Sequence, residues 1–278
     1  MRINFYGKRI PPPTKEVALA FGSDVEPTLM KGGQGTVYRA GNIILKPGDE
    51  SEFNNLMCQI FVNLPEAQGF RFARPINSAT GWIYNGYAAW TFLEGEHLDG
   101  HYKEKLDASQ KFHKFIKNVE KIGSMGSGQD SWSIADRVAL GEREFNYDKE
   151  FQNLYEQIQP YLGDVPKDRQ LIHGDLYGNF LIDPVLPPAI IDFSPAWGPN
   201  GFAESIMLTD AIMMGNLKPE DLTFFKEIPI MKLLAWRGLL RRITEQPEHI
   251  RYLGKDKEQA IEEAQAFQKA IDFLKRHF

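Results

Sequence analysis

Cysteine is almost absent from this sequence: Cys58 is the only one in 278 residues. No disulfide can therefore form within the chain, which is typical of a reducing compartment. The sequence also lacks a stretch of roughly 20 apolar residues for a membrane span and an apolar N-terminal segment of signal-peptide length. We therefore expect a cytoplasmic protein, with Cys58 as a buried structural thiol in the apolar segment 56–62.

A basic excess is missing as well. The formal net charge is −5 and the isoelectric point is near 5.8, so neither nucleic acid nor an anionic membrane surface is an expected partner. No group of His and Cys residues has the spacing of a zinc or iron site, and no internal repeat is present. The composition is that of an ordinary globular protein, 42% hydrophobic and 25% charged, long enough for one large domain or two modest ones.

The first third of the chain is rich in strand patterns. Gly41 and Asn42 separate two β-prone runs, 36–39 and 43–46, which predicts a hairpin. Apolar residues at helical spacing predict a helix over 51–64, with Ser51 or Asp49 as its N-cap. A short helix is expected over 15–21, and strands are expected over 72–76, 82–84 and 87–93. These patterns indicate a small antiparallel sheet with one main helix.

Helical patterns dominate after Gly95. Helices are predicted over 106–119, 147–162, 202–214, 219–226, 230–243 and 255–277, with breaks at Gly215 and Pro247. The change of character predicts a boundary near Glu94 and Gly95. The sequence thus predicts an α+β protein with two domains, residues 1–94 and 95–278, of which the second holds the acidic excess.

The strongest chemical signal is the segment 171–197, LIHGDLYGNFLIDPVLPPAIIDFSPAW. Two short apolar runs on either side of a proline-rich turn, 180–182 and 189–191, predict a hairpin. Four polar side chains surround this hairpin: His173, Asp175, Asn179 and Asp192. Such a set suits metal-assisted phosphoryl transfer, because one carboxylate can orient the attacking hydroxyl while an amide and a second carboxylate hold Mg²⁺. The segment therefore indicates a kinase.

Three glycines precede the first predicted hairpin: Gly32, Gly33 and Gly35. Their unhindered backbone N–H groups can wrap around nucleotide phosphates. Lys46 ends the following strand and can pair with the α- and β-phosphates if an acid on the next helix holds it. Glu52 is the expected acid, and Glu50 is the alternative. Taken alone, each feature also fits an ordinary glycine-rich turn and a solvated lysine.

Together these motifs occur in the order seen in protein-kinase-like folds, over residues 32–194. The sequence HGDL-x-x-N followed by IDF resembles the aminoglycoside phosphotransferase and choline kinase superfamily. That resemblance implies a bilobal fold, with a small antiparallel β-sheet lobe that binds nucleotide and a larger, mainly helical lobe with the catalytic loop and the acceptor site. The segment 90–96, WTFLEGE, resembles the linker whose backbone meets the adenine.

By this resemblance, Asp175 is the catalytic aspartate that accepts or orients the proton of the acceptor hydroxyl. Asn179 and Asp192 would bind Mg²⁺, with ATP or GTP as the co-substrate. Since Asp175 takes the proton, we expect His173 to be a scaffold residue. His113 lies in the helical sequence FHKF, where we expect a packing residue rather than a ligand. The implied nucleotide-binding residues are Gly32, Gly33, Gly35, Lys46, Glu52, Thr91, Phe92 and Leu93.

The sequence departs from the superfamily pattern at four places. Asn179 follows Asp175 by four positions where the superfamily usually has five, and we expect Gly178 to allow the tighter turn. The other departures are Met30 in place of the first glycine of the loop, the short spacing from Lys46 to Glu52, and Ser194 and Pro195 after Asp192.

The function stays open between two main classes. The first is a small-molecule kinase, and the second is a nucleotide-binding pseudokinase that serves as a regulatory or interaction module. An unrelated α+β protein with chance glycines is the third hypothesis. Acceptors known among relatives include aminoglycosides, choline, ethanolamine, methylthioribose, homoserine and fructosamines. We expect an amino-bearing or sugar-like acceptor, and the acidic excess after residue 94 favours the amino-bearing kind.

Overall fold

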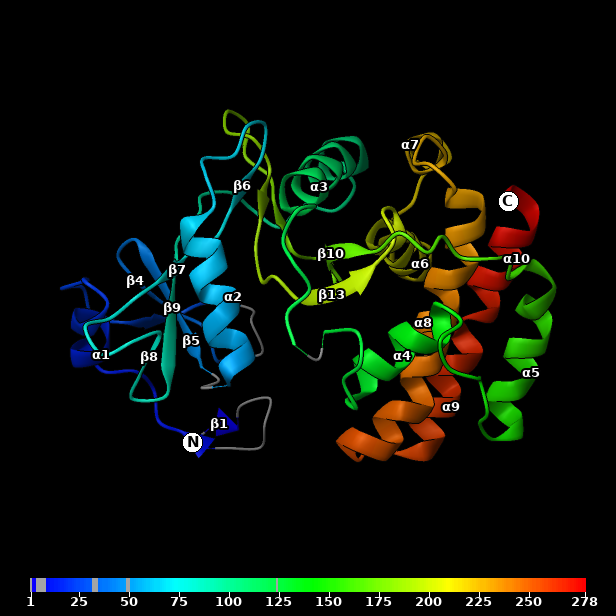
Figure 1. Cartoon of the computed structure of the whole chain (residues 1–278), viewed down its shortest axis with the longest axis horizontal. Helices are drawn as coiled ribbons and strands as arrows, with labels where there is room; N and C mark the ends of the chain where they lie inside the picture. Colours follow the sequence, from blue (N-terminus) through cyan, green and yellow to red (C-terminus); the bar gives the residue numbers. More distant parts are fainter. Residues whose placement is uncertain (1, 4–8, 32–34, 49–50, 124) are drawn as a thin grey trace. The chain divides into compact units, whose positions relative to one another are not determined.

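The protein is described by a computed structural model that covers residues 2–3, 9–31, 35–48, 51–123 and 125–278. The chain divides into two units, Met1–Gly95 and Glu96–Phe278, and each is described by itself (Figure 1). Four residues named above lie outside the described residues: Gly32, Gly33, Asp49 and Glu50.

The first unit is built on an antiparallel sheet. The strands of this unit are β1 (Arg2–Ile3), β2 (Arg9–Ile10), β3 (Thr28–Leu29), β4 (Tyr38–Ala40), β5 (Ile43–Pro47), β6 (Arg71–Phe72), β7 (Pro75–Ile76), β8 (Ile83–Tyr84) and β9 (Tyr87–Thr91). The sheet order is β3-β4-β5-β9-β7, with β8 also paired to β9. The predicted hairpin is confirmed, because β4 pairs with β5 around Gly41, whose φ is 61°. Cross-strand partners such as Leu45 and Ala89 are buried and form the core of the sheet.

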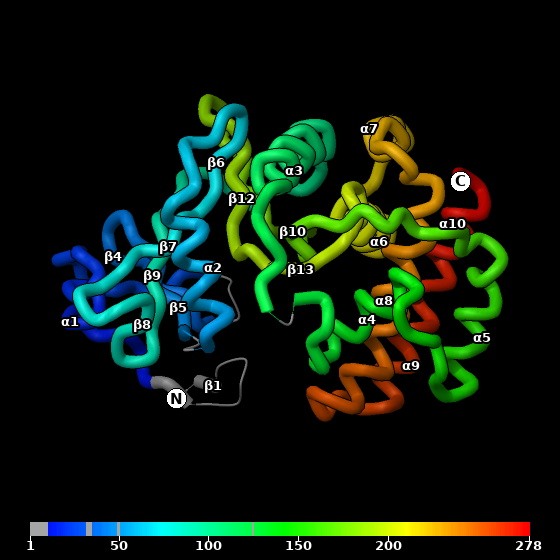
Figure 2. The backbone as a smooth tube through the Cα atoms, in the orientation of Figure 1, coloured from blue at the N-terminus to red at the C-terminus, as the bar shows by residue number. Residues whose placement is uncertain are grey.

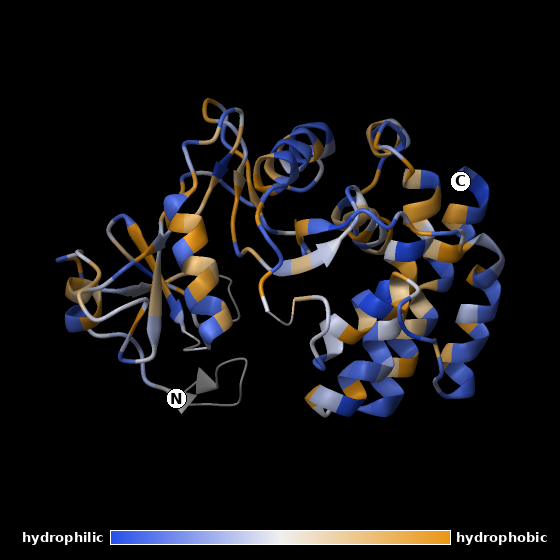
Figure 3. Cartoon of the chain, viewed as in Figure 1, coloured by the Kyte–Doolittle hydropathy of each residue, from blue (hydrophilic) through white to orange (hydrophobic). Residues whose placement is uncertain are grey.

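The described part of this unit has two α-helices, α1 (Lys15–Ala20) and α2 (Glu52–Asn63). The predicted cap of α2 is confirmed, since the Ser51 hydroxyl accepts the N–H of Asn54 at 3.2 Å. The buried face of α2 includes Met57 and Cys58, and its apolar and polar residues are visible in Figure 3. Burial raises the pKa of the Cys58 thiol to about 11, so this residue is a structural thiol as predicted.

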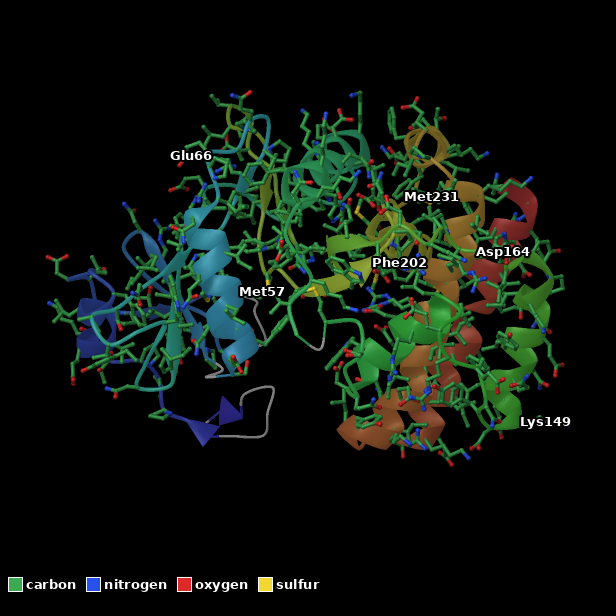
Figure 4. The ribbon with its side chains drawn as sticks, viewed as in Figure 1. Met57, Glu66, Lys149, Asp164, Phe202 and Met231 are labelled. Carbon is green, nitrogen blue, oxygen red and sulfur yellow. The ribbon has the colours of Figure 1, made fainter. Side chains whose placement is uncertain are left out.

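The second unit is mainly helical. Its elements are α3 (Tyr102–Ile116), α4 (Ser131–Ala139), α5 (Lys149–Ile158), the 3₁₀ turn η2 (Gln159–Tyr161), β10 (Gln170–His173), β11 (Phe180–Leu181), β12 (Ala189–Ile190), β13 (Pro195–Gly198), α6 (Phe202–Met214), α7 (Asp221–Lys226), α8 (Met231–Leu253), α9 (Lys257–Ala266) and α10 (Gln268–His277). The long helix α8 contacts α4, α5, α6, α9 and α10, as can be followed in Figure 2. Phe202 and Met231, labelled in Figure 4, are 1% exposed and start the two helices at the centre of this core. None of the helices in the described part of the chain has the length and apolar character needed to cross a membrane.

Two helix predictions for this unit were wrong, and one helix was not predicted. α8 does not end at Pro247 but continues to Leu253. Pro247 and Glu248 are both buried, so tertiary packing of this last part of α8 offsets the backbone hydrogen bond that proline removes. The predicted helix over 255–277 is two helices, which meet at Phe267. α4 was not predicted, because buried polar residues such as Ser131 and Asp136 dilute its apolar pattern.

Helices α6 and α8 approach each other closely at Gly238. A Cβ atom on Gly238 would lie 2.4 Å from the backbone oxygen of Ser205. Only glycine allows two helix backbones to come this near without displacing one of them. This contact fixes the spacing of the two helices that carry the charged residues described next.

Candidate functional site

The hairpin of β11 and β12 brings the two predicted Mg²⁺ ligands together. Phe180 pairs with Ile190 in an antiparallel register. The backbone N–H of Ile191 donates to the oxygen of Asn179 at 3.1 Å, which extends the ladder by one residue. Asn179 is therefore opposite Ile191, and Asp192 is the next residue along the chain. Their backbones are neighbours at the end of the hairpin away from its turn.

A tight turn closes the short loop between Asp175 and Asn179. The N–H of Asn179 donates to the oxygen of Leu176 at 3.0 Å, and Gly178 between them has a φ of 81°, as glycine commonly has in such turns. The Asn179 side-chain nitrogen donates to the backbone oxygen of Asp175 at 2.7 Å. This bond fixes the amide of Asn179 by its nitrogen, so its oxygen is the atom that suits Mg²⁺.

Asp192 has an unusual backbone conformation. Its φ is 53°, in the left-handed region that few residues other than glycine adopt, although Asp tolerates it better than most. Asp192 is exposed, and its backbone oxygen accepts a hydrogen bond from the Ser194 hydroxyl at 3.3 Å. Strained backbone of this kind is concentrated at functional sites in proteins.

His173 connects the two halves of this segment. Its Nδ1 accepts the backbone N–H of Asp175 at 3.2 Å, and its Nε2 lies 3.1 Å from the oxygen of Ile191. Because a carbonyl oxygen only accepts, the proton of the ring is on Nε2. Burial lowers the pKa of His173 to about 4, although the hydrogen bond to Ile191 opposes that effect. The neutral imidazole of His173 therefore connects the backbone of Asp175 to that of Ile191, the residue before Asp192. This is the scaffold role expected for His173.

Arg242 of α8, which the sequence did not point to, holds the carboxylate of Asp175. Its Nη2 donates to Oδ1 of Asp175 at 3.0 Å. The same guanidinium makes two bonds to Asp210 of α6, at 2.6 and 2.8 Å, and contacts both oxygens of Glu245. The Asp175 side chain is 48% exposed, and among the described residues only its Oδ1 has a partner. Oδ2 is therefore the oxygen that can meet an incoming hydroxyl.

Arg241, together with Arg242 and their carboxylate partners, forms a larger charged cluster. Arg241 donates to Asp136 of α4 at 2.8 Å and also binds Glu245. Burial raises the pKa of Asp210 and of Asp136, while each arginine opposes this effect on its partner. The four carboxylates of Asp136, Asp175, Asp210 and Glu245 outnumber the two guanidinium groups, so the cluster has a negative excess when all are ionised. Its one sequence signal is the pair of adjacent arginines within the apolar run GLLRRI.

The described residues contain no group of three His, Cys, Asp or Glu side chains arranged to hold a metal. The donor set present, one amide just before β11 and one carboxylate just after β12, fits Mg²⁺ rather than zinc. Mg²⁺ usually keeps several waters and takes its other ligands from substrate phosphates, so it needs few protein ligands.

The fold is found among known structures. The choline kinase LicA from Streptococcus pneumoniae superposes with a TM-score of 0.59 at 16% identity, covering 95% of this chain and 98% of that one. The chain has a kinase-like fold. A choline kinase from Cryptosporidium parvum gives a TM-score of 0.55 at 12% identity, with 91% and 90% covered. The streptomycin-ATP-APH(2")-IIa ternary complex gives 0.54 at 11%, with 91% and 96% covered. No family model and no curated protein matches the sequence.

The kinase-like fold confirms the predicted fold class and the resemblance to aminoglycoside phosphotransferases and choline kinases. Within it, Lys46 is half-buried on β5 opposite Ala88. Gly35 has a φ of 70°. Glu52 is exposed in the first turn of α2, and its pairing with Lys46 stays a prediction. The nucleotide roles of these three residues stay predictions as well.

Backbone hydrogen bonds distinguish the three residues predicted to meet the adenine, Thr91, Phe92 and Leu93. The N–H of Thr91 donates to the oxygen of Arg74 at 2.9 Å, and the N–H of Phe92 donates to the oxygen of Asn42 at 2.8 Å. Among the three predicted residues, Leu93 alone has a backbone N–H that makes no hydrogen bond to a described residue. Leu93 is therefore the member of this set whose N–H is available to a base.

Gly178 offers a test of the shortened loop. The change Gly178→Ala adds a Cβ that meets no atom within 4 Å, so its cost is the strain of a left-handed alanine, about 1–2 kcal/mol. We expect this strain to lower the rate of the phosphotransfer proposed below, since the turn holds Asn179. Gly254→Ala is the matched control, because Gly254 also has a positive φ, 66°, and open space but ends α8. Urea unfolding should show similar losses of stability for Gly178→Ala and Gly254→Ala. Equal activities of the two variants would contradict a role of this turn in activity.

Proposed function

We propose that the protein is a Mg²⁺-dependent phosphotransferase that moves the γ-phosphate of ATP or GTP to a hydroxyl group of a small molecule. The observation that carries this proposal is the short network around the hairpin: the Asn179 amide is bound to the Asp175 backbone, and Asp192 follows Ile191, whose N–H donates to the oxygen of Asn179. One unit thus supplies a carboxylate for the hydroxyl and two oxygen ligands for a metal.

In this proposal, Asp175 accepts or orients the proton of the acceptor hydroxyl through Oδ2, while Arg242 keeps the carboxylate in place through Oδ1. Asn179 and Asp192 would hold Mg²⁺, which neutralises charge on the transferred phosphate when it is bound. The glycines before β4, Lys46 and the backbone of Leu93 would bind the nucleotide.

An amino-bearing acceptor is favoured by the charge around Asp175. The cluster of Arg241, Arg242 and four carboxylates has a negative excess when all four are ionised, and that excess attracts an ammonium group. The names of the structural neighbours agree with this expectation, since they include choline kinases and complexes with streptomycin and gentamicin. Sugar-like acceptors without an amine are the alternative, as the neighbour macrolide 2'-phosphotransferase suggests.

The test is a screen for ADP or GDP release with a library of amino alcohols, aminoglycosides and sugars, run with Mg²⁺ and with a chelator. We expect an acceptor-dependent release that needs Mg²⁺ and is lost in Asp192→Asn, because an amide is a weaker metal ligand than a carboxylate. Nucleotide binding without transfer to any acceptor would favour the pseudokinase. Absence of a shift in melting temperature with Mg²⁺ and ATP or GTP would contradict both.

A further inference from the structure

A buried carboxylate lies on α6, away from the residues assigned so far. Glu204 is fully buried, and three donors from α3 converge on its Oε1: Ser109 at 2.5 Å, Gln110 at 2.8 Å and His113 at 2.9 Å. Burial raises the pKa of Glu204, and the hydrogen bonds from His113 and Ser109 oppose this effect by lowering it. A buried ionised group of this kind is costly to desolvate, and packing alone does not require it.

The other ring nitrogen of His113, Nε2, contacts the catalytic segment, so the Glu204 carboxylate orients the His113 ring toward that segment. The backbone N–H of His173 lies 3.1 Å from Nε2 of His113. A backbone N–H can only donate, so Nε2 is an acceptor and the ring proton must be on Nδ1, facing Glu204. The imidazole is therefore neutral, and Glu204 selects the tautomer that can accept from His173.

The hydrogen bond between His113 and the backbone of His173 connects α3 to the proposed catalytic residues. The backbone of His173 is fixed by His113, and its side chain binds the N–H of Asp175 and the oxygen of Ile191. Gln170 adds a second link, since its side chain donates to the backbone oxygen of His113 at 3.1 Å. The order of contacts is Glu204, His113, His173 and then Asp175, all in one unit.

We propose that Glu204 and His113 are positioning residues for phosphotransfer, and that they set the place of Asp175 by holding the backbone of His173. This inference rests on the proposed function. It corrects the expectation that His113 only packs, because its Nε2 makes a directed bond to the catalytic segment. A displacement of a reacting group by about 1 Å can cost roughly a hundredfold in rate.

Two substitutions at His113 separate positioning from packing. His113→Gln places an amide oxygen near the former Nε2, so it can still accept from His173 but gives up Nδ1 and its bond to Glu204. His113→Asn keeps a donor near Nδ1 for Glu204 and loses the acceptor for His173. We expect kcat to fall about 10- to 100-fold in the Asn variant, with KM for nucleotide and acceptor nearly unchanged. The Gln variant should retain most of kcat.

Hydrogen exchange gives a readout that does not depend on activity. Amides of the segment 170–176 should exchange faster in His113→Asn than in His113→Gln or the unchanged protein. Equal exchange in the two variants would overturn the inference even if no acceptor were ever found. Loss of kcat in the Gln variant equal to that in the Asn variant would overturn it as well. Faster exchange in the Asn variant alone, in a protein without transferase activity, would support the bond and contradict the proposed function.

Discussion

Asp175→Asn is expected to lower kcat by about 10²- to 10⁴-fold, the usual contribution of a positioned general base. An amide oxygen can still accept the Arg242 bond that now ends on Oδ1, so the loop should keep its structure. An amide cannot take up the proton of the acceptor hydroxyl. KM for nucleotide should change little. The measurement is the rate of ADP or GDP release with a saturating acceptor.

Asp183→Asn is the matched control for that result. Asp183 lies in the turn of the same hairpin, and its Oδ1 accepts the N–H groups of Val185 and Leu186, each at 2.8 Å. Asn forms this kind of turn as readily as Asp, so the control should retain full activity. If Asp175→Asn retained more than about a tenth of kcat, the base assignment would be wrong.

Arg242→Met is expected to destabilise the second unit by about 3–5 kcal/mol, the typical cost of removing one partner from a buried ion pair. Asp210 and Glu245 would be left buried without this guanidinium, since their side chains are 15% and 4% exposed. Asp175 would also lose its one side-chain partner among the described residues, so activity should fall in the remaining folded protein.

The control for this change lies on the same helix. Arg251 is 61% exposed and lies 3.8 Å from Glu248, too far for a hydrogen bond. The buried Glu248 keeps its hydrogen bond from the Tyr147 hydroxyl without Arg251, so Arg251→Met should cost no more than about 1 kcal/mol. Urea unfolding followed by circular dichroism would give both values. Equal free energies of unfolding for Arg242→Met and Arg251→Met would show that the Arg242 cluster contributes little to folding. In that case, adding Asp210→Asn to Arg242→Met would not raise the free energy of unfolding.

Features set by neighbouring residues in the sequence were predicted well. The range predicted for α6 agrees with its observed ends because glycines with φ of 90° and 74°, Gly201 and Gly215, bound it. The β11–β12 hairpin and the cluster of His173, Asp175 and Asn179 were predictable because all lie within one short segment.

Features that depend on distant residues were not predictable from local patterns. Pro247 breaks a local rule, and burial of that part of α8 overrides it. Arg242 binds Asp175 and Asp210, which are 67 and 32 residues away, and no spacing in the sequence relates them. The bond from His113 to the His173 backbone spans 60 residues, so only the packing of α3 beside β10 reveals it.

The close approach at Gly238 has a consequence for how this site can evolve. Gly238 lies one helical turn before Arg242, and any side chain there would push α8 away from Ser205 of α6. The reach of Arg242 to Asp210, and with it the orientation of Asp175, would change. The dimensions of this cluster therefore depend on a glycine that has no functional group of its own, and a substitution at that position is disfavoured whatever the other residues of the site become.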